Sequence, residues 1–361
     1  MNPFVTIMAV FAALGLTDKI LGGKLGLADE FDKGLATSGG LALSTVGFYC
    51  IGITAVEQNS AAIAALSAHL PFDPSVIVGC LLAPDMGGLP LAQKIAASPL
   101  VGVFSGAFLC GGIGMTVCYQ LPVFLGAIPR EDRSDLMRGF VFGFLGLPVG
   151  LIPAGLLLGL SAGTLLRSIL PVLILCAALG LAYSFAPDGT VRVLKGFGSV
   201  VSVLSWVLFA LAVSVLFFDT HFTDTALIEE IMGLILRMVL VAAGGLVLSK
   251  VLLAAFPKLL WQIAEKLGVN REAVIGLLLS CTQSLAMLPL FSKMDRRGKI
   301  ANAAFSVGGA YLTGGQLAFV SSLVSGRQAT LYVLSKVLAG TAGVCLALAL
   351  TKKDDREGET G

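Results

Sequence analysis

Long runs of apolar residues, separated by short polar or charged stretches, make up most of the chain. Several runs reach the roughly 20 residues that a helix needs to cross the hydrocarbon core of a bilayer. They are continuous rather than alternating, which excludes the strands of a membrane β-barrel. The pattern therefore predicts an all-α polytopic membrane protein. The apolar segments cover residues 3–21, 36–56, 75–98, 99–126, 137–160, 164–186, 197–218, 231–252, 273–292, 299–325 and 329–350.

Two of these segments contain residues that interrupt a helix. Segment 75–98 has two prolines and two glycines within residues 84–90, and segment 273–292 has the polar run Ser280-Cys281-Thr282-Gln283-Ser284. Irregular backbone at membrane depth is tolerated only where protein or a water-filled cavity satisfies its polar groups. We interpret both segments as re-entrant hairpins, which leaves about nine transmembrane helices. The alternative is a chain with about 10–11 full spans.

The distribution of basic residues favours the hairpins. With an outer N-terminus, nine spans and two hairpins place most Lys and Arg residues on the inner side, and Lys94, Arg167 and Arg327 outside. This agrees with the excess of basic residues in cytoplasmic loops. If segment 75–98 crossed fully, the basic residues within 130–138 would move outside, and the pattern would fail there.

Weak internal similarity divides the chain into two halves. Ile77–Leu82 resembles Val274–Leu279, and Phe108–Gly112 resembles Tyr311–Gly315. Since the two hairpins would enter from opposite sides, the repeats would be inverted, and paired interrupted segments then point to a substrate site. Chance similarity between glycine-rich helices is the alternative. The expected organisation is a first repeat over 1–160 with hairpin 75–98, a connecting helix and loop over 161–196, a second, inverted repeat over 197–350 with hairpin 273–295, and a disordered tail over 351–361.

Composition narrows the possible functions. The chain is 56% hydrophobic and 13% charged, with a net charge of only +2, so no basic surface for nucleic acid is expected. Its seven cysteines are scattered without a C-x-x-C pair, and His69 and His221 both fall in expected loops. We expect free thiols that pack between helices, no metal site and no cofactor.

Asp85 is the one acidic residue well inside an apolar segment. An intramembrane carboxylate is costly and rare, which makes it a functional-site hypothesis. Its neighbours Met86, Gly87 and Gly88 complete the candidate substrate site in the first half. The structural alternative is a carboxylate that caps a broken helix or holds a bound ion.

Neutral polar residues supply the candidate site in the second half. The position that matches Asp85 is about Thr282, which is followed by Gln283 and Ser284, and Asn302 and Gln316 lie in the next segment. One carboxylate among neutral donors and acceptors would bind a small cation with a hydroxyl group better than an anion. The alternatives are that residues 282–284 satisfy a broken backbone and that Asn302 and Gln316 form hydrogen bonds between helices.

An intramembrane enzyme is the alternative from a different class. Intramembrane aspartyl proteases need two aspartates at membrane depth, and this chain supplies one. The His-Glu-x-x-His pattern of zinc proteases is absent, and neither histidine is placed to act as a base. The sequence therefore favours a transporter, with no catalytic residues.

The stretch Ala83-Pro84-Asp85-Met86-Gly87-Gly88 is the most specific part of a resemblance that covers most of the chain. The chain resembles the bacterial ethanolamine transporter family, the permease of the ethanolamine-utilisation system. This resemblance implies a multi-spanning carrier of the bacterial inner (plasma) membrane that lets ethanolamine enter the cell. The other matching stretches are Asp18–Ile20, Ser38–Gly40, Pro129–Arg133 and, more weakly, Arg297–Phe305 and Leu317–Phe319.

The second half departs from the family pattern at two places. Where the family has an Asn-rich stretch, this chain has Thr282-Gln283-Ser284-Leu285. Where the family has Gly-Asp-His-Leu, it has Gly314-Gly315-Gln316-Leu317, which loses a carboxylate. These changes leave open a shift of substrate within the family.

The resemblance and the polar residues together predict uptake of protonated ethanolamine by alternating access. Asp85 would pair with the ammonium group, and Thr282, Gln283 or Asn302 would bind the hydroxyl group. A related carrier for another small polar amine or metabolite is the alternative. The expected partners are the small amine and the lipid bilayer, without nucleic acid, and the sequence leaves open a homo-oligomer and the coupling ion.

Overall fold

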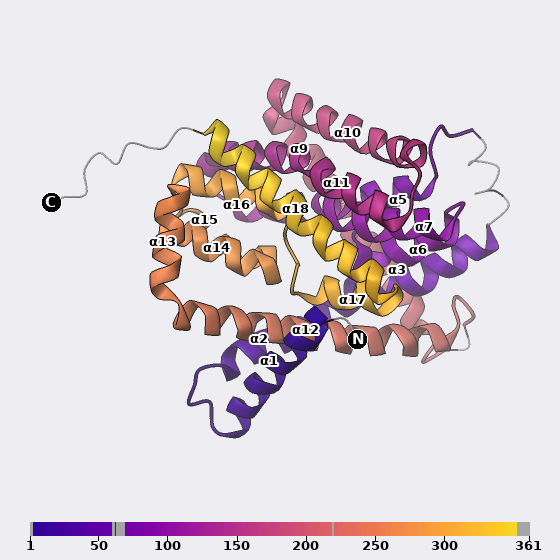
Figure 1. Ribbon diagram of the computed structural model, residues 1–361. Helices are drawn as coiled ribbons and strands as arrows, with labels where there is room; N and C mark the ends of the chain where they lie inside the picture. The colour runs from indigo at the N-terminus through magenta and orange to yellow at the C-terminus, as the bar shows by residue number, and fades with distance from the viewer. Residues whose placement is uncertain (1–2, 60–61, 63–68, 219, 352–361) are drawn as a thin grey trace.

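A computed structural model describes residues 3–59, 62, 69–218 and 220–351 (Figure 1). All regular secondary structure in these ranges is helical, which confirms the predicted all-α class. Residues 352–361, which hold most of the expected tail, lie outside the described residues.

Eight helical stretches among the described residues are long and apolar enough to cross a membrane, which confirms a polytopic membrane protein. Several of them consist of more than one helix. They are α1 (Pro3–Ile20); α2 (Ala28–Leu35) with α3 (Ser38–Gln58); α7 (Pro99–Val103) with η2 (Phe104–Gly114), η3 (Thr116–Gln120) and α8 (Leu121–Ala127); η4 (Arg130–Asp132) with α9 (Arg133–Leu158); α10 (Ala162–Phe185); α11 (Pro187–Ser214); α12 (Thr225–Ala255); and α18 (Gly326–Leu350).

The one predicted span that is not among these eight stretches, residues 299–325, is interrupted. It consists of α16 (Arg296–Gly308) and α17 (Gly315–Leu323), joined by non-helical residues 309–314. Tyr311 in this break has a φ of 62°, the one positive φ of a described non-glycine residue. Such a conformation is uncommon for a bulky side chain and persists only where the surrounding structure holds it.

The first interrupted segment reverses direction. It contains α5 (Ser75–Leu81), η1 (Pro84–Gly88) and α6 (Leu89–Ile95), and Leu82 and Ala83 between them are extended. Proline disfavours a helical residue before it, which explains the break at Ala83. The Ala97 amide donates a hydrogen bond to Asp73 Oδ2 at 2.8 Å, so the two ends of the segment lie together.

The second interrupted segment has the same geometry. It contains α14 (Arg271–Thr282), η5 (Ser284–Met287) and α15 (Leu288–Phe291), with an extended Gln283 at the break. Asn270 Nδ2 donates to the Lys293 carbonyl at 2.8 Å, and the Asn270 amide donates to Asp295 Oδ1 at 3.0 Å. That the two hairpins enter a membrane from opposite sides stays a prediction.

The helices pack in two groups. The wall helices are α1, α2, α3, α11 and α12: α1 and α2 pack on α12, and α11 packs on α3. The hairpin core consists of both hairpins, residues 99–127, α9, α16, α17 and α18, in which α9 packs on α16 and α18. In Figure 1, α12 lies along the lower side with α1 and α2, and α10 lies at the top. Of the α-helices, α10 and α13 belong to neither group, and α13 (Pro257–Leu267) connects α12 to the second hairpin.

Glycines allow the wall helices to approach each other closely. A Cβ atom on Gly47 of α3 would lie 2.4 Å from the Phe209 amide nitrogen of α11. A Cβ atom on Gly244 of α12 would lie within van der Waals distance of the Met8 carbonyl of α1. Small residues at such crossings are typical of membrane helices.

Candidate functional site

A tight turn in η1 determines the position of Asp85. Gly87 has a φ of 80°, which favours glycine, and the Gly88 amide donates to the Ala83 carbonyl at 3.1 Å. A Cβ atom on Gly87 would lie 2.7 Å from Phe48 Cβ of α3. The turn therefore packs against α3 and leaves the half-buried Asp85 side chain at a cavity.

The cavity has a volume of about 420 Å³ and lies between the two helix groups. The hairpin core contributes the carboxylate, two tyrosines, two methionines and a glutamine, and the wall helices contribute mainly small, apolar and hydroxyl side chains. The lining residues are Asp85, Met86, Met115, Tyr119, Gln283 and Tyr311 from the core, and Ala36, Thr37, Gly40, Leu41, Leu43, Ser44, Ser202, Ser205 and Trp206 from the other side.

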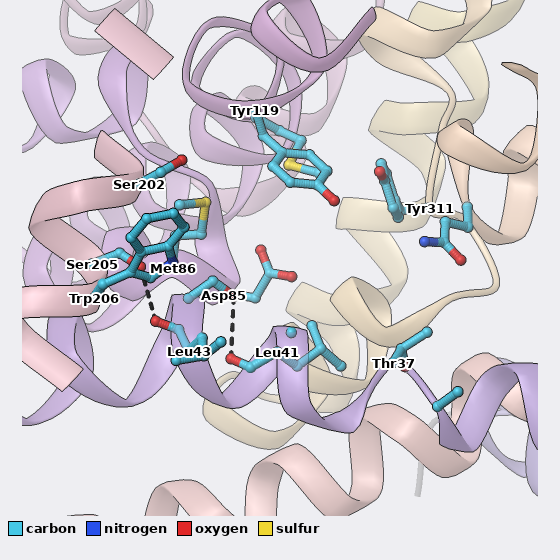
Figure 2. A pocket seen from close by; sticks show the side chains of 15 residues that line it. Thr37, Leu41, Leu43, Asp85, Met86, Tyr119, Ser202, Ser205, Trp206 and Tyr311 are labelled. Atoms are coloured by element: carbon cyan, nitrogen blue, oxygen red, sulfur yellow. Dashed lines mark hydrogen bonds between the residues drawn. The ribbon is translucent and has the colours of Figure 1, made fainter. Parts of the chain in front are cut away.

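Figure 2 shows the Asp85 carboxylate directed into the open space, with Tyr119 and Tyr311 on one side and the backbone of α3 on the other. Aromatic faces and a carboxylate both attract a cation. The arrangement suits an organic ammonium ion that is partly removed from water.

Hydroxyl groups of the wall helices already use their hydrogens. Ser205 Oγ donates to the Leu43 carbonyl at 2.8 Å, and Ser44 Oγ donates to the Leu41 carbonyl at 3.1 Å. Each hydroxyl oxygen keeps lone pairs and can still accept a hydrogen bond. On the side of α3 and α11 the cavity therefore offers mainly acceptors, which fit a ligand with N–H or O–H donors.

A second cavity lies next to the first. Its volume is about 560 Å³, and it shares Tyr119, Ser202 and Trp206 with the first cavity. It extends along α11 to Lys195, one helical turn beyond Ser199. The two cavities are neighbours, and together their lining residues run from Asp85 to the N-terminal part of α11.

Polar groups behind Asp85 are incompletely paired. Asp85 Oδ1 is buried without a hydrogen-bond partner in the described part of the chain, and so is Gln316 Nε2. Tyr332 donates to Gln316 Oε1 at 2.6 Å. Gln316 and Lys336 both interact electrostatically with the Asp85 carboxylate. Asp85 thus connects the cavity to a buried polar cluster.

The sequence analysis missed Lys336. Lys336 belongs to α18 and is 4% exposed, and its Nζ donates to the Gly111 and Ala310 carbonyls, each at 2.7 Å. The signal was present, because Lys336 is a single charge in the middle of the apolar segment 329–350. An intramembrane lysine meets the same criterion that identified Asp85.

The predicted site residues fall into three groups. Asp85, Met86 and Gln283 line the cavity, and Gly87 and Gly88 shape the turn beside it. The other four lie outside the lining. Ser284 is behind Tyr311, where its hydroxyl donates to the Tyr311 hydroxyl at 2.9 Å, and Gln316 is in the cluster behind Asp85.

Thr282 and Asn302 form hydrogen bonds away from the cavity. Thr282 Oγ1 lies 3.1 Å from Thr313 Oγ1, and Asn302 Nδ2 donates to the Ala273 carbonyl at 2.9 Å. Asn302 thereby links the second hairpin to α16. Among the described residues, no group of three or more His, Cys, Asp or Glu residues could hold a metal ion.

The helices and the cavity define a class of protein. Among the described residues, eight helical stretches are long and apolar enough to cross a membrane, and a cavity between the helices contains a carboxylate, which is an arrangement expected of a membrane permease. The family described as "Ethanolamine utilisation protein, EutH" matches residues 2–350, and the chain belongs to this family. It is therefore a multi-pass membrane protein, which in bacteria lies in the inner membrane.

Several relatives are similar over nearly the whole chain. The "Probable ethanolamine permease EutH" of Listeria monocytogenes is 31% identical over 99% of this chain and 96% of the relative. The protein of the same name from Salmonella typhimurium is 27% identical over 97% and 95%. "Uncharacterized protein YxeR" of Bacillus subtilis is 28% identical over 96% and 94%. No solved structure matches the chain significantly. The predicted family resemblance is thus confirmed.

Proposed function

We propose that this permease carries protonated ethanolamine into the bacterial cell by alternating access. The names of the relatives support ethanolamine as the substrate. The observation that carries the proposal is the Asp85 carboxylate, which faces a cavity of about 420 Å³ and forms no ion pair within the described residues. A carboxylate in a largely buried site that is not in direct contact with a cation attracts one, so the site favours a cationic ligand.

The two ends of the ligand would meet different parts of the cavity. The ammonium group would bind Asp85 beside the rings of Tyr119 and Trp206, and the hydroxyl group would bind Gln283. Of the three residues considered for the hydroxyl group, Gln283 is the one that lines the cavity, while Thr282 and Asn302 bond to neighbouring helices. The proposal therefore assigns the hydroxyl group to Gln283.

The position of the cavity supports a movement between the two helix groups. The first helix of each expected repeat packs on the second helix of the other: α1 on α12 and α11 on α3. The cavity lies beside the first of these pairs in contact, α11 and α3. At the corresponding pair, α1 and α12, the helices approach each other closely at Met8 and Gly244. We infer that the hairpin core moves against the wall helices, so that each region opens in turn.

The cavities along α11 indicate which side is open. In the predicted topology, residues 36–44 and Lys195 lie at the inner ends of their helices. The two neighbouring cavities, which reach both of these parts of the chain, would then open to the cytoplasm. The conformation described here would be the one that releases the substrate inside.

Uptake into liposomes tests the proposed function. Purified protein would be reconstituted, and labelled ethanolamine uptake measured at mildly acidic pH, where little neutral amine crosses the lipid. We expect saturable uptake, and a loss of about tenfold or more in Asp85→Asn, because a hydrogen bond to a charged group contributes roughly 1.5–3 kcal/mol.

The matched control is Glu57→Gln, which also removes one negative charge. Glu57 pairs with Lys94 on the surface, and both side chains are about half exposed, so uptake should stay at the wild-type level. Equal uptake by Asp85→Asn and wild type would reject Asp85 as the substrate carboxylate. Folded wild-type protein without uptake above empty liposomes would reject ethanolamine as the substrate.

A further inference from the structure

The proposed function leaves one buried charge unused. Lys336 lies near the middle of α18, and the residue is 4% exposed. A lysine at this depth is expensive and points to a role in function. The question is what a basic side chain does beside a site that binds a cation.

The contacts of Lys336 come from irregular backbone in both halves of the chain. Gly111 belongs to η2, whose hydrogen bonds have the wide spacing of a π-helix, and Ala310 lies in the break between α16 and α17. Each carbonyl accepts one hydrogen bond from Nζ at 2.7 Å. The side chain thus joins the two interrupted elements of the hairpin core.

Two acceptors are as many as a neutral amine can serve. An ammonium group has three N–H donors, and a neutral amine has two. The remaining contact of Nζ is the face of the Tyr332 ring, with 5.3 Å to its centroid. Lys336 can therefore lose one proton and keep both carbonyl bonds, which would hold the side chain in place in either state.

Asp85 of η1 is the charged side chain in the described residues that acts on Lys336. The two do not form a direct ion pair, and the other titratable groups that interact with the Asp85 carboxylate include Cys110 of η2, Tyr311 in the break and Tyr332 of α18 itself. The helices that pack on α18 from the other side, α9 and α16, approach it through Gly150 and Gly308. One carboxylate thus faces one lysine in an otherwise uncharged region.

We propose that Lys336 is the proton carrier of this permease, and that one proton leaves the cell for each substrate ammonium ion that enters. The proposal rests on the proposed function. In the empty protein, the Lys336 ammonium group balances the Asp85 carboxylate. When a substrate ammonium ion binds Asp85, Lys336 releases its proton.

The physical reason is the balance of buried charge. One carboxylate cannot compensate two cations in a region of low dielectric, and an uncompensated buried ion is strongly unfavourable. On release, an N–H bond of Nζ breaks, the electron pair stays on nitrogen, and the proton passes to water on the outer side, from which the substrate has entered. After the substrate leaves on the inner side, Nζ binds a proton from that side and carries it outward. The full cycle moves no net charge.

Two separate driving forces test this cycle in proteoliposomes. The initial rate of labelled ethanolamine uptake would be measured with an acidic interior at zero potential, and with an inside-negative potential at equal pH. Protein-mediated uptake is the rate above that of liposomes with Asp85→Asn. We expect acceleration by the acidic interior and no response to the potential. A carrier that moved one net charge would instead accumulate substrate about 50-fold at about 100 mV.

Lys336→Gln gives the opposite expectation. The glutamine amide keeps N–H donors for the backbone carbonyls but has no titratable charge. The empty variant would return with the negative charge of Asp85, so the inside-negative potential should accelerate uptake and the acidic interior should not. Lys94→Gln, a change of an exposed lysine in α6, should behave as wild type.

The outcomes separate the two proposals. Wild-type uptake that follows the potential and ignores the pH difference would overturn the role of Lys336, as would a Lys336→Gln variant with wild-type responses. Absence of saturable wild-type uptake would count against the proposed function instead. If Lys336→Gln does not fold, the two wild-type measurements still decide.

Discussion

At the scale of single residues, the direction of Asp85 depends on a backbone conformation that few residues can adopt. Gly87, two positions later, has a positive φ and lies against Phe48 of α3. The turn therefore fixes the carboxylate at the boundary of the two helix groups. A side chain at position 87 would disturb the backbone and the contact with α3 together.

Gly87→Ala should lower both stability and uptake. The left-handed conformation costs an L-residue about 1–2 kcal/mol, and the new Cβ would meet Phe48 Cβ at 2.7 Å. Thermal unfolding in detergent would measure the loss. The control is Gly39→Ala in α3, where nothing lies within 4 Å and alanine favours the helix. Equal melting temperatures for Gly87→Ala and wild type would contradict this account of the turn.

Site residues were predictable where a polar side chain falls inside an apolar segment. Asp85 and Gln283 could be identified because charged and amide groups are unexpected in apolar segments. Tyr119 and Trp206 could not, because aromatic residues are common in membrane helices and only tertiary packing decides which of them face a cavity. Lys336 had a clear signal, but its helix was counted only as a span.

At the scale of elements, each hairpin is closed by polar side chains at its base. Asp73 accepts hydrogen bonds from the amides of Ser75 at 2.9 Å and Ala97 at 2.8 Å. Asn270 has the corresponding place in the second hairpin, where it bonds Lys293 and Asp295. Because these bonds join the two ends of each segment, they hold the turn that presents the site residues.

Asp73→Ala should loosen the first hairpin. The loss leaves two amides without their partner, at a cost of about 1–3 kcal/mol, and faster hydrogen exchange is expected across residues 82–97. The control is Asp224→Ala, which removes the acceptor of the Ala226 amide at the start of α12 and should leave exchange in the hairpin unchanged. Unchanged exchange in Asp73→Ala would show that other contacts close the hairpin.

The positions of the helices and hairpins could be predicted from the sequence more closely than their exact bounds and helix types. Proline, glycine and a polar run identified both interrupted segments, since these residues act on the local backbone. The helix α2 was missed, and α12 extends beyond the predicted 231–252 at both ends. The π-helical spacing of residues 104–114 was not predictable, because it depends on the packing of fully buried side chains.

At the scale of the whole molecule, the cavity separates two groups of helices that would have to move against each other. Two surface or interface ion pairs allow a comparison. Glu57–Lys94 joins α3 to α6, which belong to different groups. Asp132–Lys299 joins η4 to α16, and η4 directly precedes α9, so this pair lies on the side of the hairpin core.

Cross-linking these positions should have opposite effects. Cysteines at 57 and 94, joined by a short thiol cross-linker, should stop uptake, because the core could no longer move against α3. Cysteines at 132 and 299, joined in the same way, should leave uptake near the level of the unlinked variant. Labelled ethanolamine uptake before and after linking, and again after cleavage of the linker, measures both. Full uptake with positions 57 and 94 linked would exclude this movement.

The bonds from Lys336 also bear on how the protein is made. Gly111 and Lys336 are 225 positions apart in the chain. At a synthesis rate of about 5–20 residues per second, Lys336 is synthesised roughly 10–45 s after Gly111. During that time Asp85 has no basic partner from α18, and the carbonyls of the irregular helix lack their donor. The polar groups of the first half therefore lack these partners until α18 is synthesised, so assembly of the core depends on the synthesis of α18.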